Sequence, residues 1–288
     1  MSALTVSKEE EKRLKGQGFL NNRGTDEFSA RVITVNGKVT AAQHRCMAEA
    51  AEKFGNGNLT YTTRLSVEIQ GIPYEKIEEF QEFIAKEGLE TGGTGAKVRP
   101  VVSCKGTTCQ YGLLDSYAIS EEIFRRFYKG YCQVALPHKF KIAVGGCPNN
   151  CVKPNLNDVG IIGQRIPHFD SEACKGCKKC AIEAACPNKV AKVVDGKLHI
   201  DEELCRHCGR CVGKCPFHSI PDGTYGFKIY IGGRWGKKIS HGKALNRIFT
   251  SEEEALDVIE KAILLFKDQG LKGCLLYTSP SPRDPKTS

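Results

Sequence analysis

The sequence predicts a mixed α+β fold in which a cysteine-rich module interrupts a second α/β domain. Three observations support this prediction. Strand and helix patterns alternate over the first part of the chain, and they resume on both sides of a block at 170–222. That block carries a large share of the 15 cysteines in this chain of 288 residues.

The first domain is expected over 1–92. Asn36-Gly37 is a turn signal after a strand, Thr40 is a preferred helix cap, and Pro73 is a preferred residue at the start of a helix. The predicted order is strand, helix, strand and helix, at 28–35, 40–54, 59–69 and 73–88. Four elements in this order predict a small α/β sandwich.

The second domain is expected in two pieces, 93–169 and 223–273. Its strands are predicted near 98–103, 140–144, 158–163 and 226–231. One helix is predicted at about 116–128, and another at about 251–269, where Ser251 and Glu254 form a capping box. Because this pattern flanks the cysteine-rich block on both sides, the block is interpreted as an insertion.

Two cysteine runs fill the insertion. The first has the form Cys-x2-Cys-x2-Cys-x5-Cys-Pro and the second Cys-x2-Cys-x2-Cys-x3-Cys-Pro, which resembles the bacterial two-cluster ferredoxin. In that module the fourth cysteine of each run binds the other cluster. The resemblance implies one [4Fe-4S] cluster on Cys174, Cys177, Cys180 and Cys215 and a second on Cys205, Cys208, Cys211 and Cys186. Paired zinc sites are the alternative, since they also use Cys-x2-Cys pairs.

A further cysteine set lies in the host domain. Cys104-x4-Cys109 and Cys147-x3-Cys151 form two close pairs, and the second pair stands in the segment Gly-Gly-Cys-Pro-Asn-Asn-Cys. Four soft thiolates in two close pairs suit one further cubane cluster. Buried structural cysteines are the alternative interpretation.

Over about 17–273, the chain resembles the sulfite and nitrite reductase family. The coupled siroheme–[4Fe-4S] centre of this family uses Cys-x5-Cys and a Cys-x3-Cys within Gly-Cys-Pro-Asn-x-Cys. The second motif matches in full, and the first is one residue shorter here. The resemblance implies that Cys151 bridges the cluster and the siroheme iron and that Asn149 contacts the cofactor. It also implies a ferredoxin-like α/β sandwich half-domain plus a siroheme-binding α/β domain interrupted by a bacterial 2[4Fe-4S] ferredoxin insertion.

The same resemblance assigns roles to basic residues. Arg64, beside Thr62 and Thr63, corresponds to an arginine that meets siroheme carboxylates, although the family's nearby glutamines are Leu65 and Glu68 here. A pocket for the substrate anion is implied for Arg31, Arg99, Lys139 and Lys141. Arginine forks and lysine ammonium groups hold an oxyanion and offset its charge. Taken alone, each of these residues would be interpreted as a solvated surface charge.

The implied activity is the six-electron reduction of sulfite to sulfide by an oxidoreductase of the anaerobic or dissimilatory type. Electrons would enter through the inserted ferredoxin. Nitrite reduction to ammonia on the same centre is one alternative, and an iron–sulfur electron-transfer subunit without siroheme is another. No flavin or nicotinamide motif is found, so an electron-donor protein or subunit is expected. Larger family members carry two similar halves, and one half predicts a homodimer or a higher even oligomer.

Charge and hydropathy argue against other classes of protein. The formal net charge is +9, but the basic residues are scattered among acidic ones, so no nucleic-acid partner is expected. The sequence contains no apolar run long enough to span a membrane. The charged N-terminal segment has no secretory pattern, which predicts a cytoplasmic protein.

Residues 274–288 are excluded from the fold prediction. The segment Cys274-Leu-Leu-Tyr-Thr-Ser279 matches the translation of a transposon end that is used as a sequencing adapter. These residues are therefore interpreted as an adapter-derived artefact. A natural disordered tail rich in proline and serine is the alternative.

Overall fold

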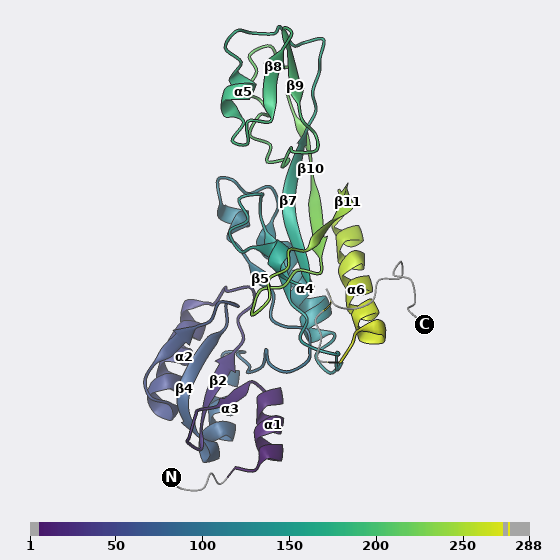
Figure 1. Ribbon diagram of the computed structural model, residues 1–288. Coiled ribbons are helices and arrows are strands. Elements are labelled where there is room, and N and C mark those ends of the chain that lie inside the picture. The colour runs from purple at the N-terminus through teal and green to yellow at the C-terminus, as the bar shows by residue number, and fades with distance from the viewer. Residues whose placement is uncertain (1–5, 273–275, 277–288) are drawn as a thin grey trace, which may run out of the picture. The chain divides into compact units, whose positions relative to one another are not determined.

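The computed structural model of the protein describes residues 6–272 and residue 276 (Figure 1). It confirms the predicted α+β class. The elements are α1 (Lys8–Gly16), β1 (Phe19–Asn21), β2 (Glu27–Val32), α2 (Ala41–Phe54), β3 (Leu59–Tyr61), β4 (Val67–Pro73), α3 (Ile77–Ala85), β5 (Val102–Ser103), α4 (Ser116–Ile123), β6 (Ile142–Gly145), β7 (Val159–Pro167), α5 (Ala181–Ala185), β8 (Ala191–Val194), β9 (Lys197–Ile200), β10 (Gly223–Ile231), β11 (Lys243–Phe249) and α6 (Glu252–Gln269).

The chain divides into two compact units. Unit 1 comprises residues 1–103, 120–143 and 260–288, and unit 2 comprises residues 104–119 and 144–259. The division passes within α4, within β6 and within α6. The basic residues of the predicted anion pocket belong to unit 1, and all the cysteines assigned to clusters belong to unit 2.

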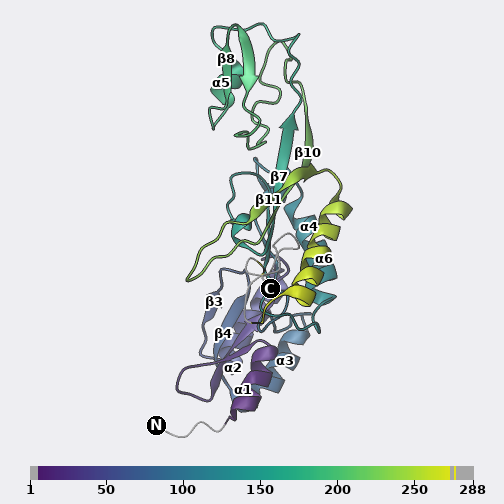
Figure 2. The ribbon, with the colours of Figure 1, turned by 45° about the vertical axis from the view of Figure 1, so that its right-hand side comes forward.

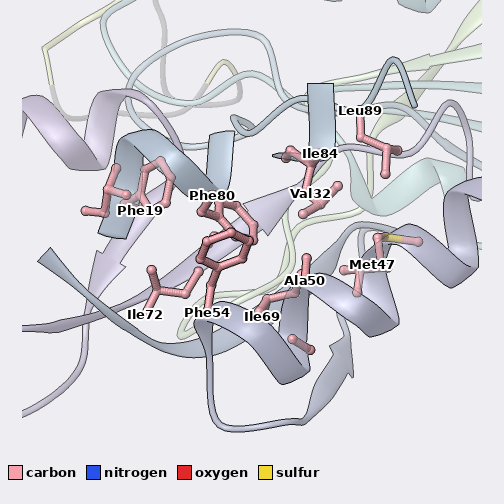
Figure 3. Packing of buried hydrophobic residues seen from close by; sticks show 14 of the residues in the cluster. Phe19, Val32, Met47, Ala50, Phe54, Ile69, Ile72, Phe80, Ile84 and Leu89 are labelled. Atoms are coloured by element: carbon pink, nitrogen blue, oxygen red, sulfur yellow. The ribbon is translucent and has the colours of Figure 1, made fainter. Parts of the chain in front are cut away.

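Unit 1 contains a four-stranded antiparallel sheet in the order β1-β2-β4-β3. Buried side chains from this sheet and from α1, α2 and α3 form one hydrophobic core (Figure 3). The ring of Phe80 packs edge-to-face against Phe19 and Phe54, with centroid separations of 6.1 and 5.9 Å. Edge-to-face packing of this kind adds to the stabilisation that the buried area itself supplies.

Local sequence signals account for the two long helices of this core. The Thr40 hydroxyl accepts from the Gln43 amide at 3.1 Å, and the Gln43 side chain accepts from the Thr40 amide at 3.0 Å. This capping box satisfies amides at the start of α2, which confirms the predicted beginning of the helix. The helix predicted after Pro73 begins with a 3₁₀ turn at 74–76 and continues as α3.

The prediction of a single strand over 59–69 is wrong. The segment forms β3 and β4, which pair with each other, and Leu65 adopts a left-handed φ of 61° in the turn between them. The Thr62 hydroxyl accepts from the Ser66 amide at 3.2 Å and so closes the turn. Threonine favours strands by its branched shape, but its hydroxyl also stabilises turns, and here the second property decides.

The second sheet has the order β11-β10-β7-β6-β5. Its longest pair is β7 and β10, which run antiparallel in unbroken register. β7 extends beyond the predicted limit of residue 163 to Pro167, and α1, β1, α5, β8, β9 and β11 were not predicted. The helix predicted over 116–128 is α4 followed by a π-helical stretch over Phe124–Lys129. Short or polar elements carry little hydrophobic periodicity, which is why the sequence pattern misses them.

The cysteine-rich block follows β7 and precedes β10 within unit 2 (Figures 1 and 2). It contains α5 and the two-stranded hairpin of β8 and β9. Its buried core is small and consists of Cys174, Ile182, Ala191, Leu198 and Ile220. Most of the other residues of the block lie in loops. Contacts of the backbone and side chains around the cysteines therefore hold much of the block in its conformation.

Within the described part of the chain, no helix is long and apolar enough to cross a membrane. The segment interpreted as adapter-derived, 274–288, lies outside the described residues except for Leu276.

Candidate functional site

The loops that carry the first cysteine of each host-domain pair lie against each other in unit 2. The Cys104 amide donates to the Val144 carbonyl at 3.1 Å, and the Gly146 amide donates to Cys104 Sγ at 3.0 Å. A Cβ atom on Gly146 would stand 2.6 Å from the Gly106 Cα, so this approach requires glycine. The close contact brings the segment before Cys147 next to the segment after Cys104.

The other three host-domain thiols lie close enough to Cys147 to affect its ionisation. Burial raises the pKa of the Cys147 thiol, and the nearby thiols of Cys104, Cys151 and Cys109 act in the same direction. Ionising such a set in isolation would place several negative charges together. A positively charged iron–sulfur core removes that repulsion, so this donor set fits a cubane cluster.

The loop from Cys147 to Cys151 is held by a residue that the sequence analysis missed. Asn150 adopts a left-handed φ of 58°, and its Nδ2 donates to Asn155 Oδ1 at 2.9 Å. Its Oδ1 is buried and has no hydrogen-bond partner among the described residues. Asn149, the predicted cofactor contact, is exposed. The motif leaves position 150 open to any residue, so the sequence offered no signal for Asn150.

A cavity in the cysteine-rich module is lined by the four cysteines that the ferredoxin resemblance groups together, Cys186, Cys205, Cys208 and Cys211. Prolines and aliphatic side chains supply much of the remaining lining. Burial raises the pKa of Cys211 to about 11, and the thiols of Cys205, Cys208 and Cys186 contribute. The structure therefore brings together one cysteine from the first run and three from the second.

Two of the module's thiols accept hydrogen bonds from several backbone amides. Burial by itself would raise the pKa of Cys186, but amides of residues 188–191 donate to the sulfur and lower the pKa overall. At Cys215 burial is likewise outweighed, by the Ser219 hydroxyl and amide and by the Phe217 amide. Amides directed at sulfur stabilise thiolates, and hydrogen bonds to sulfur tune iron–sulfur clusters.

Of the other cysteine set, Cys174 is part of the module's hydrophobic core, and Cys180 and Cys215 pack against that core. Cys177 is half-buried. Across the described residues, no three His, Cys, Asp or Glu side chains converge as ligands of a single metal ion. A cubane differs from such a site, because its four thiolates bind different iron atoms.

In unit 1, Arg31 forms an ion pair with Glu68. The Arg31 Nε donates to Glu68 Oε1 at 3.0 Å, and a second nitrogen of the guanidinium contacts the same oxygen. Both side chains are mostly buried, with 22% and 17% exposed. Arg31 also donates to the Gly93 carbonyl at 3.4 Å. Its charge is therefore partly compensated within the protein.

Arg99 shares the Gly93 carbonyl with Arg31. Burial, together with repulsion from Arg31, lowers the pKa of Arg99 to about 10. Its Nε is buried and lacks a hydrogen-bond partner among the described residues. A buried guanidinium with spare donor capacity is suited to binding an anion. The Gly93 amide in turn donates to the Tyr128 hydroxyl at 3.1 Å.

Arg64 lies in the turn between β3 and β4. Its guanidinium donates to the carbonyls of Pro100 at 2.7 Å and Ile142 at 3.1 Å. The Thr62 hydroxyl contacts the Ser66 hydroxyl at 2.7 Å, and Thr63 is exposed. These contacts fix the direction of the Arg64 side chain.

Lys139 and Lys141 are half-buried on either side of buried Phe140. Val98 and Phe140 form a parallel bridge, and the Arg99 amide donates to the Phe140 carbonyl at 2.8 Å. Because side chains alternate along extended backbone, both lysines and Arg99 lie on the face opposite Val98 and Phe140. Three of the four predicted anion ligands therefore share one face.

The fold and these residues define a cysteine-rich α+β protein with a set of half-buried cations. Residues 94–273 match the nitrite and sulphite reductase 4Fe-4S domain, and residues 21–87 match the nitrite/sulfite reductase ferredoxin-like half domain. The chain belongs to the nitrite and sulfite reductase family. This confirms the resemblance found in the sequence and the ferredoxin-like half-domain that it implied.

Individual proteins support the same family. The coenzyme F420-dependent sulfite reductase of Methanocaldococcus jannaschii is 30% identical over 219 residues, which cover 76% of this chain and 34% of that protein. This chain thus spans about a third of that relative's length. An uncharacterized protein of the same organism is 31% identical over 245 residues, covering 85% of this chain and 84% of that protein.

Among solved structures, dissimilatory sulfite reductase I resembles this chain with a TM-score of 0.68 and 22% identity, over 87% of this chain and 65% of the other. At this identity the likeness concerns the fold.

Proposed function

We propose that the protein is a siroheme-dependent reductase that converts sulfite to sulfide. The observation that carries the proposal is the convergence of Cys104, Cys109, Cys147 and Cys151 in a chain of the nitrite and sulfite reductase family. In this proposal the four thiolates would hold a [4Fe-4S] cluster, and Cys151 would also serve the siroheme. Siroheme would supply a redox-active iron for the reduction of the substrate anion.

The anion-binding role is assigned to cations of unit 1. Arg99 offers a buried guanidinium with an unused donor, and Lys139 and Lys141 lie on the same face. Their charges would offset that of the substrate and their protons would be available as sulfur–oxygen bonds break. Arg31, Arg64, Thr62 and Thr63 complete the proposed set, with Asn149 at the cofactor.

The inserted block over 170–222 is proposed to deliver the electrons. Its two cysteine sets would hold two more [4Fe-4S] clusters, which makes three in all. The grouping of Cys186 with Cys205, Cys208 and Cys211 around one cavity supports the exchange of ligands between the two runs. The electrons would come from a donor protein or subunit, which we propose to be cytoplasmic, like the reductase itself.

An absorption spectrum and an iron assay of anaerobically purified protein test this proposal. Siroheme absorbs toward the red, whereas iron–sulfur clusters give a broad shoulder. We expect red bands, with about twelve iron atoms and twelve acid-labile sulfides per chain from three cubanes. Clusters without siroheme would identify an electron-transfer subunit instead, and stoichiometric zinc would remove the ferredoxin assignment.

Nitrite is the second candidate substrate, and one observation favours it. Glu68 compensates the charge of Arg31, which lowers the net positive charge that this arginine offers to a doubly charged anion. Nitrite carries a single negative charge, so it needs less compensation. Steady-state assays with each anion on the same preparation, reported as kcat/KM, distinguish the two substrates.

We also propose that two copies of the chain assemble around a two-fold axis and share their sites. A polyanionic macrocycle is held more firmly when protein excludes water from both of its faces. Co-expression of a Cys151→Ser chain with a Lys139→Met/Lys141→Met chain should restore part of the activity that each lacks. A monomer in light scattering that carries siroheme and is active would contradict shared sites.

A further inference from the structure

A cleft of about 580 Å³ lies within unit 2, between the host-domain cysteine loops and the cysteine-rich module. One wall is formed by the segments 110–113 and 147–149, and the other includes 184–185 and 208–210. Cys147 lines the cleft from the host-domain set, and Cys208 lines it from the module. None of the four cysteines assigned to the module's first cluster is among the lining residues.

Strand β7 fixes the spacing of the two walls. A Cβ on Gly163 would lie 2.5 Å from the Gly146 carbonyl oxygen, so the host-domain loop packs directly on this strand. Two residues further on, the Arg165 amide donates to the His207 carbonyl at 2.7 Å, and Gly209 packs against the Arg165 side chain. Alternate residues of a strand face the same side and stand roughly 7 Å apart. The segments next to Cys147 and Cys208 are therefore neighbours on one face of β7.

Arg165 is the strand residue that lines this cleft. Its Nε is buried and has no hydrogen-bond partner among the described residues, and its guanidinium lies 4.8 Å from the centre of the Tyr225 ring. Arg210 stands 4.4 Å from the centre of the Tyr111 ring and also lines the cleft. Stacking on an aromatic ring holds a guanidinium in place without neutralising it. Two cations, Arg165 and Arg210, are thus held in place in the cleft.

We propose that this cleft is the electron-transfer junction of the protein. The cluster on Cys186, Cys205, Cys208 and Cys211 is then the exit cluster, from which electrons leave the module. Arg165 is a positioning residue whose charge sets the electrostatic balance between the clusters on the two sides of the cleft. The inference rests on the proposed function, since it takes the three cluster sites as given. The cluster on Cys174, Cys177, Cys180 and Cys215 is then the entry cluster, which receives electrons from the donor protein.

The step at the junction is a one-electron transfer. The exit cluster goes from its reduced to its oxidised state, the host-domain cluster goes from oxidised to reduced, and no bond or proton moves. Each cubane with four thiolates carries about two negative charges, and reduction adds one more. A cation between two such clusters favours the reduced state of each of them. Arg165 lines the cleft between the two cysteine loops and its Nε is buried, so water screens its charge less than it screens that of an exposed arginine.

Replacement of Arg165 tests the electrostatic part of the proposal. In the holoprotein, Arg165→Gln should shift the reduced-to-oxidised ratio of the exit cluster at least tenfold toward the oxidised form, which for one electron is about 59 mV. Arg165→Lys keeps the charge and should restore most of that ratio. The control is Arg206→Gln, which removes an exposed arginine of the same cysteine loop outside the cleft; it should shift the ratio less than about threefold, since water screens it.

The measurement is a redox titration followed by electron paramagnetic resonance. The module's two signals are assigned with Cys211→Ser and Cys177→Ser, each of which perturbs one cluster. An unchanged exit-cluster signal in Arg165→Gln, or a shift confined to the entry cluster, overturns the role of Arg165.

Wild-type protein tests the order of the clusters without any substitution at Arg165. When all centres are reduced, the exit-cluster signal should relax faster than the entry-cluster signal, because the paramagnetic host-domain centre is closer to it. Faster relaxation of the entry-cluster signal would overturn the assignment. If wild-type protein shows red siroheme bands and all three clusters but fails these tests, only the junction is wrong. If it lacks siroheme or the host-domain cluster, the proposed function fails as well.

Discussion

The half-domain of unit 1 and the cysteine-rich module of unit 2 reach an ordered structure by different means. The half-domain buries 17 core residues, all of them except Leu89 in six helices and strands, and its aromatic rings pack edge-to-face. The module buries five, and one of these is a cysteine. Burial stabilises by roughly 25 cal/mol per Å² of apolar surface, so the two regions differ greatly in the stability that packing supplies.

From this difference we infer that the cysteines of the module have a structural role beside the electron-carrying role proposed for them. Segments with cores this small are marginal unless disulfides, metals or assembly support them. Cysteine thiols flank the module's core on several sides, and amides are already directed at Cys186 and Cys215. We therefore expect the module to depend on its clusters and the half-domain to be independent of them.

Removal of iron should produce the largest difference between the module and the half-domain. Chelation under reducing conditions should unfold the module over 170–222, because metal binding and folding are coupled in small cysteine-rich units. Amide hydrogen exchange resolved by peptide should then show full exchange across the module and unchanged protection of α2 and α3. Protection of the module in the iron-free protein would break the comparison.

Truncation of the half-domain core should give the next largest effect. Phe80→Ala removes a buried ring that contacts Phe19 and Phe54, which should cost about 3–5 kcal/mol of the free energy of unfolding. Phe83→Ala, on the same helix but only partly buried, is the matched control and should cost less. Urea unfolding of the half-domain measures both. An equal loss for the two variants would show that burial at Phe80 does not control this core.

Lys141→Met separates the functions of the two regions. The substitution removes a cation of the proposed anion pocket and leaves every cysteine in place, so kcat should fall about 100-fold while the siroheme and cluster absorption stays unchanged. A spectrum recorded on the same sample as the kinetics is the check. Loss of siroheme from this variant would instead make Lys141 a ligand of the macrocycle.

The smallest expected effect concerns Tyr128 and alkaline pH. Burial raises the pKa of Tyr128 from its ordinary value of 10 to about 12. The stability that follows is fully present below pH 10 and is lost as the pH rises from 10 to 12, because only the unfolded chain releases this proton in that range. Tyr128→Phe should abolish this part of the pH dependence and cost about 1 kcal/mol at pH 8, since the Gly93 amide loses its acceptor. Urea midpoints at pH 8 and pH 11 for both proteins measure the effect, and an identical alkaline slope would exclude Tyr128 as its source.

The fold was predictable where a local rule governs the backbone. The capping box at Thr40 and the apolar face of α3 follow from residues three or four positions apart, and both are present. The turn inside 59–69 was not predictable in this way, since the same threonines suit a strand or a turn until the pairing of β3 with β4 selects one. The extension of β7 to Pro167 has a similar origin, because its register against β10 supplies the partners.

By itself, the sequence determined which family the chain belongs to and predicted which thiols group together, because cysteine ligands of a cluster recur at short fixed spacings that are visible in the sequence. Tertiary structure alone decided that Glu68 compensates Arg31, that Asn150 carries a buried amide oxygen without a partner, and that Arg165 lies between two cysteine loops. These are contacts between residues far apart in the chain or single side chains on ordinary strands and loops. The burial of these side chains and the compensation of their charges depend on the segments that pack against them. No local sequence pattern specifies those segments.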